Sequence, residues 1–214
     1  MYQIQTKMNL KTAVFILFLF HVSGLVAILF TPFSDLFLSL TPLNLLVSTF
    51  LVFHFHGKIS RLQTLSFVVI ALAGFGIEAL GVATGKIFGV YQYGPVLGWK
   101  IFETPLMIGI NWILLSYSMT YTWSRLFQNK WLIAFISAIS LVVLDVLIEP
   151  VAIFYNLWRW ESDVVPLQNF LVWGIIAFVF CSVLAQTKKD SNNPLTPYLI
   201  LVQTLFFGIL YLFS

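Results

Sequence analysis

The sequence predicts an all-α membrane protein, in which a bundle of about seven transmembrane helices forms one domain over residues 1–214. Hydrophobic residues make up 60% of the chain and charged residues 9%, whereas soluble globular domains carry about 25% charged residues. Several apolar runs reach the length of about 20 residues that a helix needs to cross a hydrocarbon core of about 30 Å. This composition excludes a soluble domain. The formal charge of +3, spread thinly between apolar runs, predicts no binding to nucleic acid.

Seven apolar stretches are expected to form these helices. They cover residues 13–30, 36–56, 64–83, 104–122, 131–153, 166–186 and 196–213. The first is expected to stay in the protein, because no small-residue cleavage site of a signal peptide stands out at its end. In the second, Pro42 either delays the start of the helix or kinks it. The third and fifth are nearly continuous apolar runs. Pro105, Pro166 and Pro197 mark the starts of the other three, where the missing N–H of proline would have no partner in any case.

Lysine and arginine are distributed unequally between alternate loops. One set of loops holds Lys7, Lys11, Lys58, Arg61, Arg125, Lys130, Lys188 and Lys189, and the other holds Lys86, Lys100 and Arg159. Because basic residues are retained on the cytoplasmic side of a membrane, this asymmetry places the N-terminus in the cytoplasm and the C-terminus outside. We therefore expect a multi-pass protein of a prokaryotic-type cytoplasmic membrane.

Three carboxyl groups lie within the predicted spans, at Glu78, Asp145 and Glu149. A rise of 1.5 Å per residue puts Asp145 about 21 Å along the outward-running fifth span, and Glu78 lies at about the same height in the third. Asn111 and Asn169 lie about 10 Å and 5 Å below the outer ends of their inward-running spans. Polar side chains from four spans are therefore expected to gather in the outer half of the bundle. The inner half is expected to contain almost none.

A carboxyl group inside a bilayer costs roughly 2.5–3.5 kcal/mol on insertion scales, so it normally faces an internal cavity. Asp145 and Glu149 are four residues apart and share one helix face. In a medium of low dielectric constant, two neighbouring carboxyl groups resist losing both protons. One of them is therefore suited to act as a general acid. The alternative is structural, with the acids holding helices together or facing water at the outer rim.

Aromatic side chains concentrate at the same outer level. Those that could line a pocket with the acids are Tyr91, Tyr93, Trp112, Trp158, Trp160 and Trp173. An aromatic belt at the membrane surface is the simplest explanation, but Trp112 and Trp173 are expected to lie deeper. Aromatic faces beside an acid stabilise a cationic intermediate, so a dry pocket of this kind suits protonation of an alkene. A retinal protein is disfavoured because the last span has no lysine, and no metal-binding cluster is predicted.

Three ordered motifs resemble a known family. EALGVATGKIFGVYQYGPVLGWKIFETPLMIGINW at 78–112 is similar to a segment of the membrane carotenoid biosynthesis proteins, of the bisanhydrobacterioruberin hydratase and γ-carotene 1′-hydratase kind. DVLIEPVAIFYNLWRW at 145–160 resembles that family's Asp, Glu-Pro and Trp-x-Trp segment, and VPLQNFLVW at 165–173 resembles its Asn-Phe-x-x-Trp segment. The chain departs from the pattern at FET, before Pro105, and at Asn156 and Leu157, where the resemblance leads us to expect glycine-containing stretches.

The resemblance implies carotenoid 1,2-hydration, which adds water to the terminal 1,2 or 1′,2′ double bond of an acyclic carotenoid end group without a cofactor. The partners that it implies are an acyclic or monocyclic carotenoid, water, the lipid bilayer and other enzymes of the carotenoid pathway. Asp145 or Glu149 would then be the acid and Glu78 its partner or base. Asn111 and Asn169 would orient water or substrate, and the aromatic side chains would line the pocket.

Two alternatives stay open. An isomerase similar to lycopene cyclase would use the same protonation and let an alkene of the substrate capture the cation. A proton-coupled transporter would use the acids as a relay, and it predicts acids spread along a path through the bilayer rather than gathered at one level.

Overall fold

The computed structural model describes residues 8–162, 164–188 and 192–213, and the chain is mainly helical. The helices are α1 (Leu10–Phe30), α2 (Ser34–Ser39), α3 (Thr41–His54), α4 (Arg61–Thr84), α5 (Met107–Trp123), α6 (Lys130–Phe154), α7 (Leu167–Thr187) and α8 (Thr196–Tyr211). The strands are β1 (Tyr91–Tyr93), β2 (Lys100–Ile101), β3 (Thr104–Pro105) and β4 (Trp158–Trp160). Each of the seven predicted spans corresponds to one helix, except the second, which is divided into α2 and α3.

Four helices, α1, α4, α6 and α7, are long and apolar enough to cross a membrane. Helices α3, α5 and α8 contain 14, 17 and 16 residues, fewer than the roughly 20 of a typical span. The second predicted span begins late because Pro42 occupies the first turn of α3, where a proline is tolerated. Pro150 does not end α6, which continues to Phe154. The count of seven transmembrane helices therefore stays a prediction.

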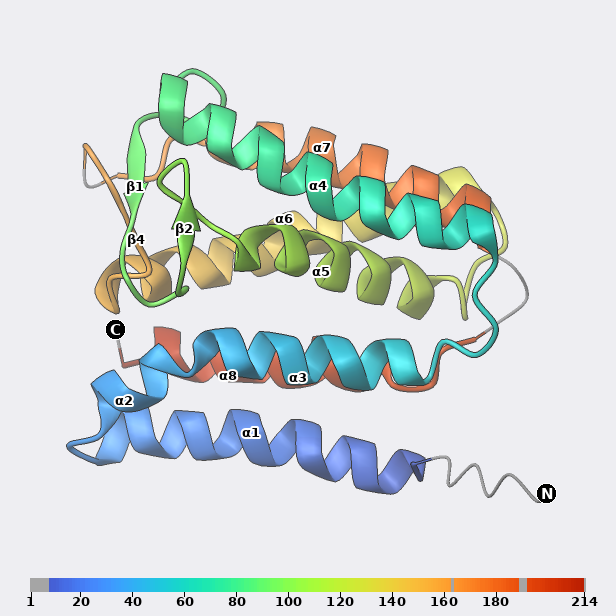
Figure 1. Ribbon diagram of the computed structural model, residues 1–214, viewed down its shortest axis with the longest axis horizontal. Helices are drawn as coiled ribbons and strands as arrows, with labels where there is room; N and C mark the ends of the chain where they lie inside the picture. Colours follow the sequence, from blue (N-terminus) through green and yellow to red (C-terminus); the bar gives the residue numbers. More distant parts are fainter. Residues whose placement is uncertain (1–7, 163, 189–191, 214) are drawn as a thin grey trace.

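The helices lie lengthwise beside one another, and all the strands are at one end of the bundle (Figure 1). The connections from α3 to α4 and from α5 to α6 lie at the opposite end. These connections carry four of the basic residues that we expect on the cytoplasmic side, namely Lys58, Arg61, Arg125 and Lys130. The strand end carries Lys100 and Arg159. The two groups of basic residues are thus at opposite ends of the molecule, and the orientation of these ends in a membrane stays a prediction.

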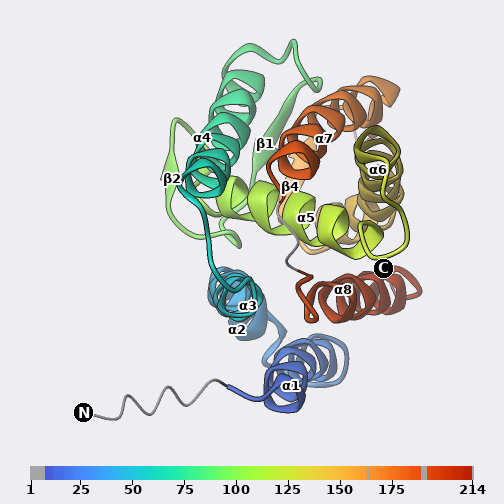
Figure 2. The ribbon, with the colours of Figure 1, turned by 90° about the vertical axis from the view of Figure 1, so that its right-hand side faces the viewer.

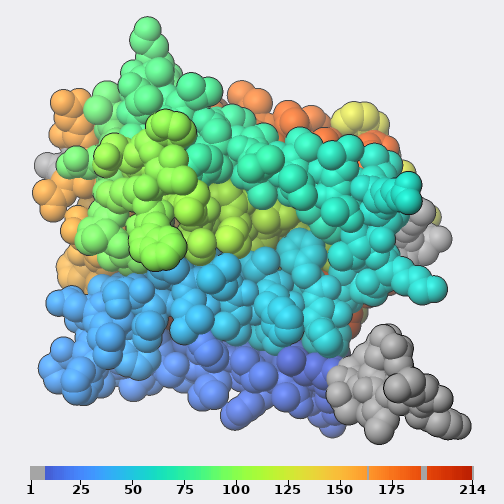
Figure 3. Space-filling model, viewed as in Figure 1, coloured from blue at the N-terminus to red at the C-terminus, as the bar shows by residue number. Residues whose placement is uncertain are grey.

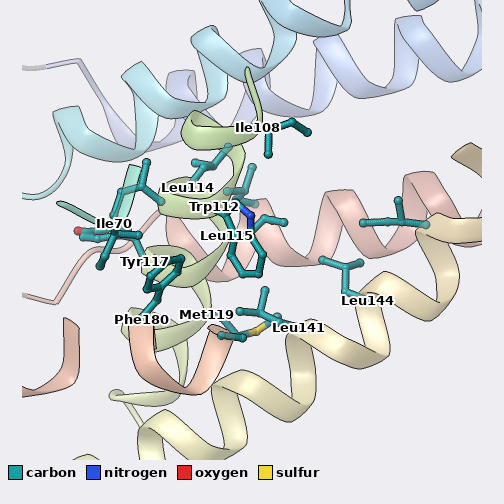
Figure 4. Packing of buried hydrophobic residues seen from close by; sticks show 14 of the residues in the cluster. Ile70, Ile108, Trp112, Leu114, Leu115, Tyr117, Met119, Leu141, Leu144 and Phe180 are labelled. Atoms are coloured by element: carbon teal, nitrogen blue, oxygen red, sulfur yellow. The ribbon is translucent and has the colours of Figure 1, made fainter. Parts of the chain in front are cut away.

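Helix α5 is the centre of the fold and contacts α3, α4, α6, α7 and α8. Side chains of α5 lie among Ile70 of α4, Leu141 and Leu144 of α6 and Phe180 of α7 (Figure 4). Two glycines let α4 and α5 approach closely. A Cβ atom added at Gly109 would lie 2.5 Å from the carbonyl oxygen of Ala71, and one at Gly74 would lie 2.7 Å from the ring of Trp112. The small residues therefore set the position of the Trp112 side chain between the two helices.

The all-α prediction missed two short antiparallel ribbons. Strand β1 pairs with β4, so that Tyr91 faces Trp160 and Tyr93 faces Trp158, with Gln92 opposite Arg159. Side chains of a strand alternate between its two faces. The four aromatic residues consequently lie on one face of the ribbon, toward the helices, and the polar pair lies on the exposed face. The ribbon covers one end of the bundle with aromatic side chains.

Both departures from the family pattern lie where the backbone is left-handed. Phe102 and Glu103 form the two-residue turn between β2 and β3, with φ of 51° and 57°, and Asn156 follows α6 with φ of 56°. Such angles are usual for glycine and tolerated by asparagine, but they cost other residues about 1–2 kcal/mol. The chain therefore keeps a conformation typical of glycine at both places although it has no glycine there.

A buried polar cluster lies at the end opposite the strands, so the expectation of an almost apolar inner half was wrong. His56 Nδ1 lies 2.6 Å from the hydroxyl of Tyr117, which also accepts a hydrogen bond of 3.1 Å from Asn193. The second amide hydrogen of Asn193 bonds to the Val52 carbonyl at 2.7 Å. Gln63 is likewise fully buried and donates to a neighbouring tyrosine. This cluster contains no acid and ties α3, α5 and the start of α8 together.

Candidate active site

Glu78 lies near the C-terminal end of α4 and is almost completely buried. One carboxylate oxygen accepts hydrogen bonds from the hydroxyls of Tyr91, at 2.5 Å, and Tyr93, at 3.0 Å. The other accepts the indole N–H of Trp112 at 3.2 Å. Gly74 precedes Glu78 by one helical turn and leaves room for this indole. Strand β1 and helix α5 thus supply the partners of an acid on α4.

Asp145 and Glu149 lie on one face of α6, as their spacing predicts, and both are buried. The side-chain amide of Asn169, on α7, donates to both of them, at 3.2 Å to Asp145 and 3.1 Å to Glu149. An amide group has two N–H bonds, so it can serve both carboxyl groups at once. Asn169 therefore fixes the two acids relative to each other.

The β4 strand supplies the other partners of Glu149. The indole N–H groups of Trp158 and Trp160 each donate to the same oxygen of Glu149 at 2.9 Å. Residues two apart in a strand lie on the same face, and this alternation lets both indoles reach one carboxyl group. The Trp-x-Trp pattern is thus explained by hydrogen bonding to an acid.

The three acids differ in how many donors they have. Glu78 and Glu149 each accept three hydrogen bonds, whereas Asp145 accepts one, from Asn169. None of these donors is lysine or arginine, so no positive charge balances a carboxylate through these bonds. Hydrogen bonds from N–H and O–H groups stabilise the ionised form of a carboxyl group. Asp145 is therefore the acid whose surroundings offer the least stabilisation to negative charge.

The three acids surround one cavity of about 40 Å³, which we call the acid chamber. Its lining includes all eleven side chains singled out in the sequence: Glu78, Tyr91, Tyr93, Asn111, Trp112, Asp145, Glu149, Trp158, Trp160, Asn169 and Trp173. Ile108 and Ile148 complete the wall. A cavity needs about 10–15 Å³ to hold one water molecule, which also requires polar partners. The acid chamber meets both conditions.

Aromatic rings form much of the chamber wall. The rings of Trp112 and Trp173 stack at a centroid distance of 4.1 Å and an interplanar angle of 26°. Tyr91 lies beside Trp160, with centroids 5.0 Å apart. The face of an aromatic ring attracts a positive charge. Carboxyl groups and indole faces therefore occur together in this enclosed space.

The two tyrosines of β1 remain neutral hydrogen-bond donors at ordinary pH. Burial raises the pKa of both Tyr91 and Tyr93 above the ordinary value of about 10, and the negative charge of Glu78 raises it further. A tyrosine with a raised pKa keeps its hydroxyl proton and can donate it to a carboxylate. These groups therefore hold Glu78 in place without contributing charge of their own.

Sequence reasoning missed three polar residues near the chamber. His21 on α1, Asn44 on α3 and Gln203 on α8 line a neighbouring cavity. Each lies in an apolar helix, with only serine or threonine as nearby polar residues and without a motif around it. Their isolation in apolar helices was the available signal. Within the described residues, no group of three or more His, Cys, Asp or Glu is placed to hold a metal ion.

The comparisons with known proteins agree with the geometry at the level of the family. A family model described as "Carotenoid biosynthesis protein" matches residues 40–213, which include the three acids and their partners. A search of curated proteins and a search of solved structures found no match. Helix α1 lies outside the matched segment. Because the match covers most of the chain, the protein belongs to the carotenoid biosynthesis protein family.

Proposed function

We propose that this protein is a carotenoid hydratase, which adds water to the terminal double bond of an acyclic end group by acid catalysis. The observation that carries the proposal is the set of three carboxyl groups, from two helices, around a cavity large enough for water. The membership of the chain in a carotenoid biosynthesis family supplies the substrate class. A carotenoid end group is a hydrocarbon. The site can therefore activate only the π electrons of its alkene.

Asp145 is the proton donor in this proposal. It has the fewest hydrogen-bond donors of the three acids, and it therefore gains least from being ionised. Its O–H bond breaks as the alkene π electrons form a C–H bond at the less substituted carbon. The other alkene carbon becomes a tertiary cation. Indole faces of Trp112 and Trp173 stabilise that charge.

Water then completes the reaction. A water molecule in the acid chamber attacks the cation and forms the C–O bond, and Glu149 accepts the proton that this water releases. Asn169 lies between Glu149 and Asp145, so it holds the two groups that exchange the proton in one cycle. Proton return from Glu149 to Asp145 restores the starting state. The balance is one alkene and one water to one tertiary alcohol, with no oxidation or reduction.

Access to water favours hydration over cyclisation. A polar depression on the outer side of the β1–β4 ribbon, lined by Gln92, Arg159 and Glu161, shares Tyr91 and Trp160 with the acid chamber. Water therefore lies only one layer of aromatic side chains away from the acids. A cyclase must protect its cation from water, and this arrangement suits capture by water better.

The test is expression in a host that accumulates lycopene or γ-carotene. Membranes containing the protein are expected to yield a carotenoid heavier by one water, and Asp145→Asn is expected to lower the yield by about 10²–10⁴-fold because it removes a general acid. Asp35→Asn is the matched control, since Asp35 is exposed on α2 and lines no cavity described above. An isomer of unchanged mass would indicate cyclisation. Unchanged carotenoids, together with solute flux that depends on Asp145, would indicate transport.

A further inference from the structure

A second cavity, of about 100 Å³, adjoins the acid chamber. The two cavities share Ile108, Asn111, Ile148 and Trp158. From these residues the second cavity extends to α1, α3 and α8, which lie on the other side of α5 from α4 and α7 (Figure 2). The acid chamber therefore continues inside the protein, toward the helices at its N- and C-terminal parts.

A third cavity, of about 360 Å³, continues from the second to the surface, and we call it the surface cavity. It shares Thr41, Asn44 and Phe206 with the second cavity. Its walls are α1 and the α2–α3 segment, whose ribbons and surfaces lie side by side in Figures 1 and 3. Leu19 and Leu43 in its lining are about half exposed, so the cavity opens on the apolar flank of the bundle.

The lining of these two cavities indicates what passes through them. No Lys, Arg, Asp or Glu lines either cavity. A charged ligand would therefore lose its hydration without a partner of opposite charge. A long hydrocarbon chain loses nothing in the same environment and gains from contact with the walls.

We propose that the polyene chain of the carotenoid enters from the bilayer between α1 and α3, passes through the surface cavity and the second cavity, and places its terminal isoprene unit in the acid chamber. This inference rests on the proposed function for the identity of the reacting end. It adds the route, the orientation of the substrate and the residues that select it. The acids line the acid chamber and neither of the other two cavities, so only the end of the chain that reaches the chamber meets them.

Phe206 is the specificity-determining residue on this route. It lines both the second cavity and the surface cavity, and its ring meets the ring of His21 edge-on at a centroid distance of 5.7 Å. Gly24 lies across from it, and a Cβ atom added there would lie 3.7 Å from the Phe206 ring. A larger side chain at position 24 would therefore fill the surface cavity, and it would do so without touching the acid chamber.

The polar side chains of the second cavity fit the return of the product. Within the described residues, the buried Gln203 amide has no hydrogen-bond partner. His21 Nδ1 donates to the Leu17 carbonyl, which leaves Nε2 of the neutral ring as an acceptor. A hydrocarbon substrate needs neither group. A tertiary alcohol that leaves along the same route meets partners for its hydroxyl at both.

The test compares two substitutions of glycine by leucine. Gly24→Leu is expected to lower both carotenoid hydration and the amount of carotenoid bound to the purified Asp145→Asn protein by at least about tenfold, because it adds three carbon atoms beyond Cβ to an apolar site. Gly208→Leu, on α8, is the control, since an added Cβ there meets nothing within 4 Å and Gly208 lines none of the cavities described above. It is expected to change neither quantity.

A short substrate separates the route from the chemistry. A ten-carbon acyclic terpene with the same terminal alkene is too short to need the surface cavity. The Gly24→Leu protein is therefore expected to hydrate it as fast as the unchanged protein does. Equal carotenoid binding by the Gly24→Leu and Gly208→Leu proteins would overturn the route, whatever the activity. If the unchanged protein hydrates no alkene, and Gly24→Leu nevertheless abolishes its carotenoid binding, the route is supported and the proposed function is overturned. Phe206→Ala is a second variant, expected to widen the range of carotenoids bound.

Discussion

The position of Trp112 depends on a single glycine, and this dependence can be measured. We predict that Gly74→Ala displaces the indole that donates to Glu78, whereas Gly76→Ala, two residues along the same helix, displaces nothing. An added Cβ atom at Gly74 lies 2.7 Å from two atoms of the Trp112 ring, while one at Gly76 meets nothing within 4 Å. The two variants share the same change in composition and the same gain in helix propensity.

The size of the effect follows from contact distances. Carbon atoms in contact lie about 3.5–4.0 Å apart, so the ring must move by about 0.8 Å to accommodate the new methyl group. A movement of that size away from Glu78 lengthens the distance from the indole nitrogen to the Glu78 oxygen from 3.2 Å to about 4 Å, which is beyond hydrogen-bonding distance. Overpacking of this kind costs about 1–3 kcal/mol. Displacement of a wall of the acid chamber by almost 1 Å is expected to lower activity by up to about 100-fold.

Two assays on detergent-solubilised protein check this prediction. Thermal unfolding is expected to show Gly76→Ala at least as stable as the unchanged protein, and Gly74→Ala less stable than Gly76→Ala by about 1–3 kcal/mol. Formation of hydrated carotenoid per folded protein is expected to fall only in Gly74→Ala. If the two variants have equal stability and equal activity, Trp112 does not depend on the space at position 74, and the account of the Glu78 site is wrong.

Three further predictions concern other parts of the molecule. Asn193→Ala removes three hydrogen bonds at the end of the bundle opposite the strands, since the amide donates to Val52 and Tyr117 and accepts from the backbone N–H of Leu195. It is expected to lower the free energy of unfolding by about 1–3 kcal/mol and to leave product formation per folded protein unchanged. Asn156→Val is expected to lower the free energy of unfolding by about 1–2 kcal/mol because of its positive φ, whereas Asn156→Gly is expected to preserve it, as melting temperatures would show. Burial raises the pKa of Tyr93, so the unfolded chain ionises first and the folded state loses stability as pH rises above about 10. A pH series of melting temperatures is expected to show a smaller loss in Tyr93→Phe, and an identical loss would contradict the burial of this hydroxyl.

The sequence predicted the positions of the helices because hydrophobicity and proline are local signals. The expected span 131–153 corresponds to α6 at Lys130–Phe154, and 166–186 corresponds to α7 at Leu167–Thr187. The gathering of polar residues at one level was predicted from the alternating direction of successive helices and the rise of 1.5 Å per residue, which together give the height of each residue in the bundle. Sequence reasoning could therefore bring Glu78 and Asp145 to one level without any knowledge of which helices are neighbours.

The ribbons and the inner polar cluster could not be predicted in the same way. Strands of three residues are too short for alternation to be distinguished from chance, although YQY and WRW do alternate. Pairing between β1 and β4 joins residues far apart in the sequence, so only the folded chain brings them together. His56 lies at the end of a predicted span, where its position in the sequence does not indicate burial. In the structure the Tyr117 hydroxyl provides a buried partner for it.

The acid chamber lies between an apolar and a polar environment, and this position accounts for a wall that combines carboxyl groups with aromatic rings. On one side the second cavity and the surface cavity lead to the apolar flank of the bundle, and on the other the ribbon separates the acids from a polar depression. Hydration of a hydrocarbon needs one reactant from each side. In the proposed hydration, Tyr91 and Trp160, which line both the depression and the acid chamber, would have to exclude bulk water while they admit single molecules. Their hydrogen bonds to Glu78 and Glu149 couple this barrier to the acids themselves, so a change in the barrier also changes the chemistry.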